Sequence, residues 1–204
     1  MDGTLLDLHF DNQFWQEHVP LRYGERNNIS IEAAKAEVFP QFKAVEGTMQ
    51  WYCVDYWSQT LDLDIAKLKE ELRHLIALHP FVIEFLDALK KNHFRVALVT
   101  NAHIKSLELK MQQTQLSGHF DKLICSHSYQ LPKENPQFWQ RLQEDEPFDP
   151  KSTLLIDDSI PVLKSAQQYG INYLLSIFKP DSQRPVKDVD EFQAIHSFQD
   201  IMPA

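Results

Sequence analysis

Acidic, hydroxyl and amide side chains stand at four points of the sequence, each beside a turn or at the end of a short apolar run. The four groups are Asp2-Gly3-Thr4, Thr100-Asn101, Lys133 and Asp157-Asp158-Ser159. Adjacent carboxylates repel each other unless a cation lies between them, and their hard oxygens suit Mg²⁺. Hydroxyl, amide and ammonium groups can hold the oxygens of a phosphoryl group. The residue types therefore indicate metal-assisted chemistry at a phosphate.

Each group also has an ordinary structural interpretation when taken alone. Thr100 and Asn101 could simply end a strand and begin a turn, and Lys133 could be a surface lysine. Asp158 or Ser159 could cap the helix that follows it. The Asp-Gly pair near residue 2 is a common turn sequence. The choice between the structural and the functional interpretation depends on the order of the groups and on the elements that precede them.

From residue 94 onward the pattern alternates between strands and helices. The predicted strands span residues 94–100, 122–126, 153–156 and 172–177. The predicted helices between them span residues 104–115, 135–145 and 160–169. This order predicts an α/β fold with a doubly wound parallel sheet. Such a sheet binds its ligands beyond the carboxyl ends of the strands, which is where three of the four groups lie.

Residues 13–79 differ, because they show helical patterns and no convincing strand. Ser30 is the predicted N-cap of a helix, and apolar residues recur every three or four positions over 51–61 and 65–78. Pro80 is predicted in the first turn of a helix that continues over 81–91. We therefore predict a core built from residues 1–12 and 80–204, with a helical insertion at 13–79.

The four groups, in this order and each after a strand, resemble the four motifs of the haloacid dehalogenase-like (HAD) hydrolase superfamily. That resemblance implies a Rossmann-like core with an α-helical cap inserted between the first and second motifs. Longer segments at 2–8, 10–15, 51–58, 100–103 and 132–134 resemble the bacterial GMP/IMP nucleotidase family. The closer resemblance implies a small phosphorylated substrate, a purine nucleoside monophosphate.

The resemblance also assigns roles to residues. It implies a Mg²⁺-dependent phosphomonoesterase that works through an aspartyl-phosphate. Asp2 would protonate the leaving oxygen and then activate the attacking water. Mg²⁺ would be bound by Asp158, by Asp157 directly or through water, and by the backbone carbonyl of Asp2. The transferring phosphoryl group would be held by Thr100, Asn101 and Lys133.

The nucleophilic aspartate of the resemblance falls immediately before Met1, and the strand that should carry it precedes residue 1. Asp7 is better interpreted as a structural residue. We expect that the reading frame begins upstream; the alternative is a truncated, catalytically silent protein. The missing strand is central in the superfamily's sheet, so without it the strands at 94–100 and 153–156 would face each other across a gap.

Tyr56 and Trp57, in an aromatic cluster of the insertion, are candidates to stack on a purine base. The alternative is that they form the insertion's apolar core. The sequence does not separate GMP from IMP. Another HAD phosphatase or a sugar phosphomutase is a further alternative. A dehalogenase is disfavoured, because its chemistry does not need the pair Asp157 and Asp158.

Composition restricts the setting and the partners. The chain has 204 residues and a formal net charge of −9, which argues against a nucleic-acid partner. Its two cysteines, Cys53 and Cys125, are predicted to be free thiols in a reducing compartment. No apolar stretch is long enough for a bilayer, and no signal peptide is visible. We therefore expect a cytoplasmic protein with no membrane partner.

Overall fold

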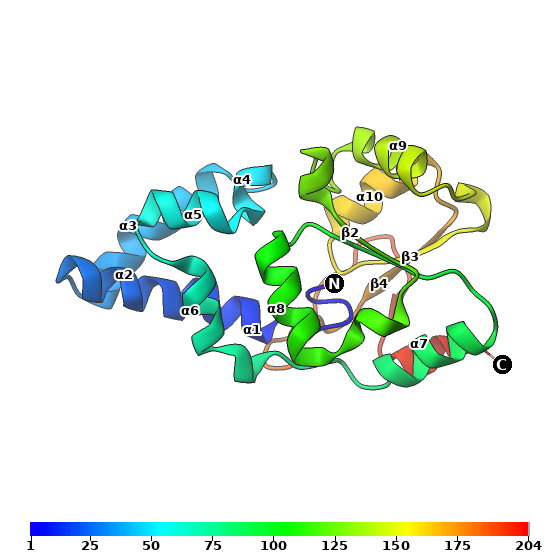
Figure 1. Ribbon diagram of the computed structural model, residues 1–204, viewed down its shortest axis with the longest axis horizontal. Coiled ribbons are helices and arrows are strands. Elements are labelled where there is room, and N and C mark those ends of the chain that lie inside the picture. The colour runs from blue at the N-terminus through cyan, green and yellow to red at the C-terminus, as the bar shows by residue number, and fades with distance from the viewer. Residues whose placement is uncertain (204) are drawn as a thin grey trace.

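A helical lobe, formed by the first third of the chain, lies beside a region of parallel strands and covering helices (Figure 1). The computed structural model describes residues 1–203. The helices of the lobe are α1 (His9–Gln13), a π-helical turn (Phe14–His18), α2 (Val19–Asn27), α3 (Ile31–Ala44), α4 (Met49–Tyr52), α5 (Val54–Leu61) and α6 (Ile65–Glu71). Their apolar faces enclose a separate hydrophobic cluster that includes Phe14, Val38 and Trp57.

The predicted helical patterns of the lobe are present but broken in places that periodicity does not reveal. Ser30 is confirmed as an N-cap, because its Oγ accepts a hydrogen bond from the backbone N–H of Ala33 at 3.2 Å. The pattern over 51–61 is divided at Cys53, which has an extended backbone between α4 and α5. The pattern over 65–78 ends as a helix at Glu71 and continues as a 3₁₀ turn (Arg73–Leu75). Consecutive short helices that pack on one core share its periodicity.

The rest of the chain alternates strands and helices as predicted. Its elements are α7 (Val82–Lys91), β1 (Ala97–Thr100), α8 (Ile104–Thr114), β2 (Lys122–Cys125), α9 (Pro136–Asp145), β3 (Leu154–Ile156), α10 (Ile160–Tyr169), β4 (Tyr173–Ile177) and β5 (Ala194–Ile195). Short 3₁₀ turns lie at Leu116–His119, Ser126–Tyr129, Pro150–Ser152 and Phe198–Ile201. The prediction for Pro80 was wrong, because Phe81 adopts a left-handed backbone (φ 64°) and α7 begins after it. β5, of two residues, was not predicted.

The strands form two separate parallel sheets among residues 1–203. β1 pairs with β2, and the other sheet has the order β3-β4-β5. β1 and β3 do not pair, yet they share both flanking clusters: Leu98 and Ile156 pack in one, and Val99 and Leu155 in the other. Both sheets therefore lie in one layer with helices on its two faces. The expectation that these two strands would not pair directly is confirmed within residues 1–203.

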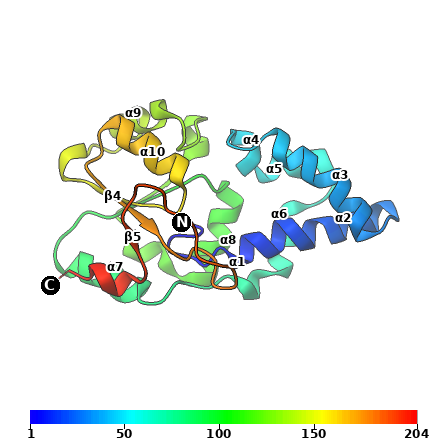
Figure 2. The ribbon, with the colours of Figure 1, turned by 180° about the vertical axis from the view of Figure 1, so that it is seen from behind.

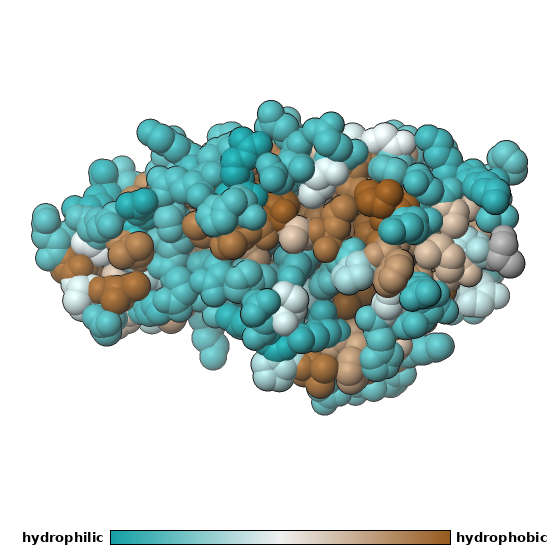
Figure 3. All heavy atoms as spheres, turned by 90° about the horizontal axis from the view of Figure 1, so that it is seen from below, coloured by the Kyte–Doolittle hydropathy of each residue, from teal (hydrophilic) through white to brown (hydrophobic). Residues whose placement is uncertain are grey.

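Apolar side chains are exposed at the amino ends of the strands. Phe94 is 57% exposed, Leu154 is 45% exposed and Tyr173 is 55% exposed. Figure 3, a view from below, shows apolar surface across the middle of the molecule. Central parallel sheets are normally covered on both faces. Some apolar surface around the strands is therefore left uncovered by residues 1–203.

The first residues lie at the centre of the molecule rather than at its edge (Figures 1 and 2). Met1 is 5% exposed, and its carbonyl oxygen accepts backbone hydrogen bonds from Thr4, Leu5 and Leu6. This tight turn places Asp2 near the ends of the strands. Within residues 1–203, no helix combines the length and the apolar character needed to cross a membrane.

Candidate active site

A cavity of about 650 Å³ opens where the carboxyl ends of β1 and β3 meet the helical lobe. Seven of the eight residues predicted to act at the site line it: Asp2, Trp57, Thr100, Asn101, Lys133, Asp157 and Asp158. Tyr56 is not among the lining residues. The carboxyl ends of parallel strands share one edge of the sheet, so the fold brings these distant parts of the sequence to one place.

Lys133 and Asp157 form a buried ion pair at the floor of the cavity. Lys133 Nζ donates to Asp157 Oδ2, and the other carboxylate oxygen accepts the backbone N–H of Ser159 at 3.0 Å. Burial is the largest single influence and acts to raise the pKa of Asp157, but the charges of Lys133 and the Met1 amino group, together with the hydrogen bonds from Lys133 and Ser159, hold that pKa below its usual value. Asp157 is therefore ionised near neutral pH, and its partner is fixed where an anionic substrate would lie.

Asp158 lacks such a partner. Its Oδ1 accepts a hydrogen bond from Thr4 Oγ1 at 3.3 Å, while Lys187 bonds only its backbone oxygen. Burial, and then the neighbouring Asp157 charge, raise the pKa of Asp158 to about 6. Two adjacent carboxylates, of which only Asp157 is paired with a lysine, are an oxygen-rich pair whose repulsion a divalent cation would relieve. The donor chemistry therefore fits Mg²⁺.

The alternative that Asp158 or Ser159 caps the next helix is wrong. Ser159 occupies the N-cap position of α10 but makes no side-chain cap hydrogen bond. The Asp158 side chain instead lies against the first turn of the chain. A Cβ on Gly3 would approach Asp158 Oδ2 to 2.4 Å, and Gly3 has a φ of 69°. Glycine is therefore required beside this carboxylate both for space and for backbone conformation.

Asn101 fixes the loop that carries the buried lysine. Its Oδ1 accepts the backbone N–H of Lys133 at 2.9 Å, and its Nδ2 donates to Glu134 Oε2 at 2.8 Å. Tyr52, from α4, donates its hydroxyl to the other oxygen of Glu134. The loop is therefore held from the end of β1 and also from the helical lobe. At the same strand end, Thr100 Oγ1 accepts the N–H of Ala102 at 3.1 Å and faces the cavity.

The amino group of Met1 lies within the carboxylate cluster. Burial, and then the Lys133 charge, lower the pKa of this amino group, while Asp2, Asp157 and Asp158 act in the opposite direction. A residue bonded to this nitrogen would therefore adjoin the candidate metal ligands.

Asp7 lies elsewhere, as expected for a structural residue. Its Oδ1 accepts backbone hydrogen bonds from His9 at 2.9 Å and Ser182 at 3.0 Å. It is not among the residues that line the cavity. Asp7 therefore ties the start of α1 to the segment after β4 and is poorly placed to attack a bound phosphate.

Sequence reasoning missed a buried network around Asp2. Lys110 Nζ lies 2.7 Å from Asp2 Oδ1 and 2.6 Å from Asp11 Oδ2, and Lys69 Nζ lies 3.2 Å from Asp11 Oδ1. Burial opposes the charge of Lys110, but Asp11 and Asp2 outweigh it and raise its pKa. Lysine is usually a surface residue, so the sequence carries no signal for this network. The network places a buried positive charge beside the Asp2 carboxylate, although Lys110 makes its hydrogen bond to Asp11 and Asp2 Oδ1 has no hydrogen-bond partner within residues 1–203.

We expect Lys110→Met to destabilise the protein by about 3 kcal/mol or more, because two carboxylates lose their shared cation in a buried setting. Lys110 is 1% exposed. Lys105→Met, on the same helix, is the matched control, because its pair with Asp55 is exposed to solvent and contributes little to stability. Urea unfolding of both variants measures the effect. An equal loss of unfolding free energy in the two variants would show that the buried network does not stabilise the protein.

Aromatic side chains of the helical lobe form the opposite wall of the cavity. They are Trp15, Phe39, Phe42, Trp51, Tyr52 and Trp57. Trp57 is the most buried of these, and its ring centroid lies 4.8 Å from that of Phe42. Trp57 Nε1 donates to the carbonyl of Trp51 at 3.0 Å, which fixes α4 against α5. The cavity is thus charged at one end and aromatic at the other.

Carboxylates and a buried lysine thus meet at the strand ends of a parallel α/β fold, and the comparisons with known proteins show the family of the chain. The chain matches the haloacid dehalogenase-like hydrolases over residues 1–176 and belongs to that family. It is 38% identical to the GMP/IMP nucleotidase YrfG of Escherichia coli (strain K12) over 204 residues, which is 100% of this chain and 92% of that protein. It is 31% identical to the phosphoglycolate phosphatase of Vibrio vulnificus (strain YJ016), over 46% of this chain and 41% of that one.

Solved structures share the fold. A HAD phosphatase from Thermococcus onnurineus superposes with a TM-score of 0.80 at 19% identity, covering 98% of this chain and 93% of that one. The HAD hydrolase YfnB from Bacillus subtilis, solved with bound magnesium, superposes with a TM-score of 0.66 at 19% identity, covering 98% and 93% of the two chains. The mixed α/β architecture with parallel strands is therefore that of the HAD family.

Proposed function

We propose that this protein is a Mg²⁺-dependent phosphomonoesterase that hydrolyses purine nucleoside 5′-monophosphates. The observation that carries the proposal is the two-ended cavity, with carboxylates and a buried lysine at one end and aromatic rings at the other. Its volume suits a nucleotide-sized ligand. The full-length similarity to a GMP/IMP nucleotidase supports the same substrate class.

At the charged end, Thr100, the backbone N–H of Asn101 and Lys133 hold the phosphoryl oxygens. Lys133 is already fixed by Asp157, so little rearrangement is needed when negative charge builds up on the phosphate. Asp2 donates a proton to the leaving 5′-oxygen and later accepts one from the attacking water. Lys110 keeps a positive charge beside the Asp2 carboxylate during both steps.

Asp157, Asp158 and the backbone carbonyl of Asp2 are the protein groups that we propose for Mg²⁺. When bound, the ion neutralises charge on the phosphate and on the attacking carboxylate. Burial and the Asp157 charge raise the pKa of Asp158, which means that its ionised form is disfavoured without a nearby cation. A metal ion would stabilise that ionised form, and this supports the assignment.

We further propose that the nucleophile is an aspartate immediately before Met1, at the end of a strand that fills the gap between β1 and β3. The split sheet and the buried position of the Met1 amino group support this placement. The nucleophile would form an aspartyl-phosphate, which divides the hydrolysis into two easier displacements. Residues 13–79 then act as the cap over a core of residues 1–12 and 80–204.

The aromatic wall is the proposed binding surface for the base. Trp57, a candidate from the sequence, lines the cavity but is 1% exposed, whereas Trp51 also lines it and is partly exposed. We expect Trp51→Ala to lower kcat/KM for IMP about tenfold or more and to leave a small aryl phosphate unaffected, since one stacked base contributes about 1–3 kcal/mol.

Trp57→Ala is the comparison variant for this prediction. If Trp57 belongs to the lobe's core, its removal lowers activity on both substrates together with the melting temperature. Assays of each variant on IMP and on 4-nitrophenyl phosphate give the ratio of variant to wild-type kcat/KM for each substrate. Equal losses for Trp51→Ala on both substrates would show that Trp51 does not contact the base.

A substrate panel tests the proposed function. The chain carrying the proposed upstream strand is assayed with Mg²⁺ on IMP, GMP, 2-phosphoglycolate and a hexose phosphate, and phosphate release is measured. We expect the two purine nucleotides to have the highest kcat/KM. Preference for phosphoglycolate or for the sugar phosphate would replace the proposed substrate class while keeping the reaction. Absence of phosphate release from all four would overturn the reaction itself.

A further inference from the structure

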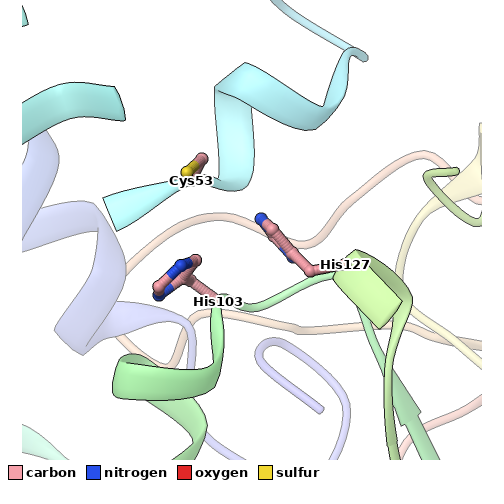
Figure 4. Close-up of side chains that lie close together, drawn as sticks. All are labelled: Cys53, His103 and His127. Atoms are coloured by element: carbon pink, nitrogen blue, oxygen red, sulfur yellow. The ribbon is translucent and has the colours of Figure 1, made fainter. Parts of the chain in front are cut away.

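Cys53, His103 and His127 come together at one edge of the cavity, from three different parts of the fold. Cys53 lies between α4 and α5, His103 is the N-cap of α8 directly after β1, and His127 lies in the 3₁₀ turn after β2. One ligand atom from each residue lies within 4.8 Å of those from the other two. Figure 4 shows the sulfur and the two rings turned toward a common space.

His127 presents a free nitrogen to this space. Its Nδ1 lies 3.6 Å from Cys125 Sγ, which sets the orientation of the ring. Its Nε2 is buried and has no hydrogen-bond partner in residues 1–203. A buried ring nitrogen without a partner is costly, so its presence calls for an explanation. Burial, and then the adjacent His103, lower the pKa of His127 to about 4, which leaves the ring neutral and able to bind a metal at neutral pH.

His103 is oriented toward the same space by its own neighbours. Its Nδ1 accepts the backbone N–H of Lys105 at 3.4 Å, and its Nε2 lies 3.7 Å from Asp55 Oδ2. Metal binding through Nε2 requires the tautomer with its proton on Nδ1, so this long hydrogen bond from Lys105 is given up when the ion binds. The rings of His103 and His127 are perpendicular, with centroids 5.0 Å apart. Burial lowers the pKa of His103 as well. Two neutral imidazoles beside a thiol match the nitrogen and sulfur ligands of Zn²⁺.

We propose that Cys53, His103 and His127 bind one Zn²⁺ ion, with water in the fourth position, and that this ion ties the helical lobe to the ends of β1 and β2. Zn–S and Zn–N bonds of about 2.3 and 2.0–2.1 Å place the ligand atoms about 3.3–3.7 Å apart. The three ligand atoms, which lie within 4.8 Å of one another, must therefore approach by up to roughly 1 Å when the ion binds. The three ligands are distinct from the carboxylates proposed for Mg²⁺, so the two sites are independent.

The site has a regulatory consequence. Because His103 also lines the cavity, an ion held there fixes the lobe over the opening through which substrate enters. Cys53 belongs to the lobe and the two histidines do not, so a bound ion would add a link to the Tyr52–Glu134 and Lys105–Asp55 contacts that already join the two parts. Zn²⁺ would then slow the exchange of substrate and product without displacing Mg²⁺.

Cobalt(II) binding tests the site without any measurement of activity. We expect wild-type protein to bind one equivalent of Co²⁺ with a thiolate-to-cobalt absorption band, and Zn²⁺ to displace it. Cys53→Ser should abolish the band, and His127→Gln should weaken Co²⁺ binding at least tenfold. Cys125→Ser is the matched control and should keep the band, because its thiol donates to the carbonyl of Ala102 at 3.0 Å. Circular dichroism confirms that each variant is folded.

The cross-link is tested separately by amide hydrogen exchange. Zn²⁺ should slow exchange in 49–54 and 126–129 of the wild-type protein and should leave both segments of Cys53→Ser unchanged. Absence of a thiolate band in the wild type, or its persistence in Cys53→Ser, would overturn the site. A band without any change in exchange would overturn the cross-link and the proposed control of the cavity.

Discussion

Adding an apolar strand that ends in aspartate before Met1 is expected to raise phosphatase turnover by about three orders of magnitude or more. Asp2 can transfer a proton and a bound cation can polarise the phosphate, but neither becomes phosphorylated. The new aspartate, bonded to the Met1 nitrogen, would join the cluster of Asp2, Asp157 and Asp158. The strand should also raise the melting temperature, since it would pair with the unpaired edges of β1 and β3.

The matched control is the same extension ending in asparagine. This control should show the higher melting temperature but no increase in turnover. The comparison therefore separates the effect of completing the sheet from the effect of supplying the nucleophile. Phosphate release from IMP and thermal unfolding are measured on all three chains. Robust turnover by residues 1–204 alone would show that the nucleophile is misplaced, and three equal melting temperatures would show that the strand is misplaced.

Asp158→Asn is expected to lower Mg²⁺-dependent turnover of the extended chain at least a hundredfold, since it removes a proposed metal ligand. The variant should nevertheless unfold at a higher temperature than its parent in EDTA. Burial and Asp157 raise the pKa of Asp158, so the ionised side chain at pH 7 disfavours the folded state. A neutral amide removes that repulsion. The gain should be complete above about pH 6 and should decrease gradually as the pH falls towards the ordinary pKa of 3.8, where Asp158 is protonated in both the folded and the unfolded state.

Mg²⁺ should raise the melting temperature of the parent and not that of Asp158→Asn. Asp87→Asn is the control, because Asp87 is an exposed residue of α7 that pairs with His119 away from the cavity. It should keep both its turnover and its response to Mg²⁺. Undiminished turnover in Asp158→Asn at the same Mg²⁺ concentration would rule out a metal-binding role for this carboxylate.

The sequence predicted the parts of the site that depend on strand ends. Thr100, Asp157 and Asp158 follow apolar runs of one parallel layer, so topology alone brings them to one edge. These positions could be predicted because a short apolar run indicates a strand, and the end of a parallel strand has a fixed place in the sheet. The expectation that β1 and β3 would not pair came instead from the resemblance to the HAD superfamily, in whose sheet the missing strand is central.

Other parts of the site depend on contacts that leave no local signal. Lys69 and Lys110 have ordinary positions in amphipathic helices, and only the packing of α6 against α8 buries them beside Asp11. The link from Tyr52 to Glu134 requires the lobe to rest on the loop of Lys133. β5, at Ala194–Ile195, is too short for a periodic pattern. Tertiary contacts, rather than propensity, determine each of these features.

The most direct test of the account is the location of the phosphoryl group during turnover. The extended chain carrying Asp2→Asn is mixed with 4-nitrophenyl phosphate, whose leaving group needs no proton, and the reaction is quenched in acid. Without its proton acceptor, hydrolysis of the intermediate slows and phosphorylated protein accumulates. Peptide mapping by mass spectrometry then locates the phosphate. We expect one phosphoryl group on the aspartate directly before Met1; a phosphoryl group on any residue of 1–204, or turnover with no phosphorylated protein, would contradict the account.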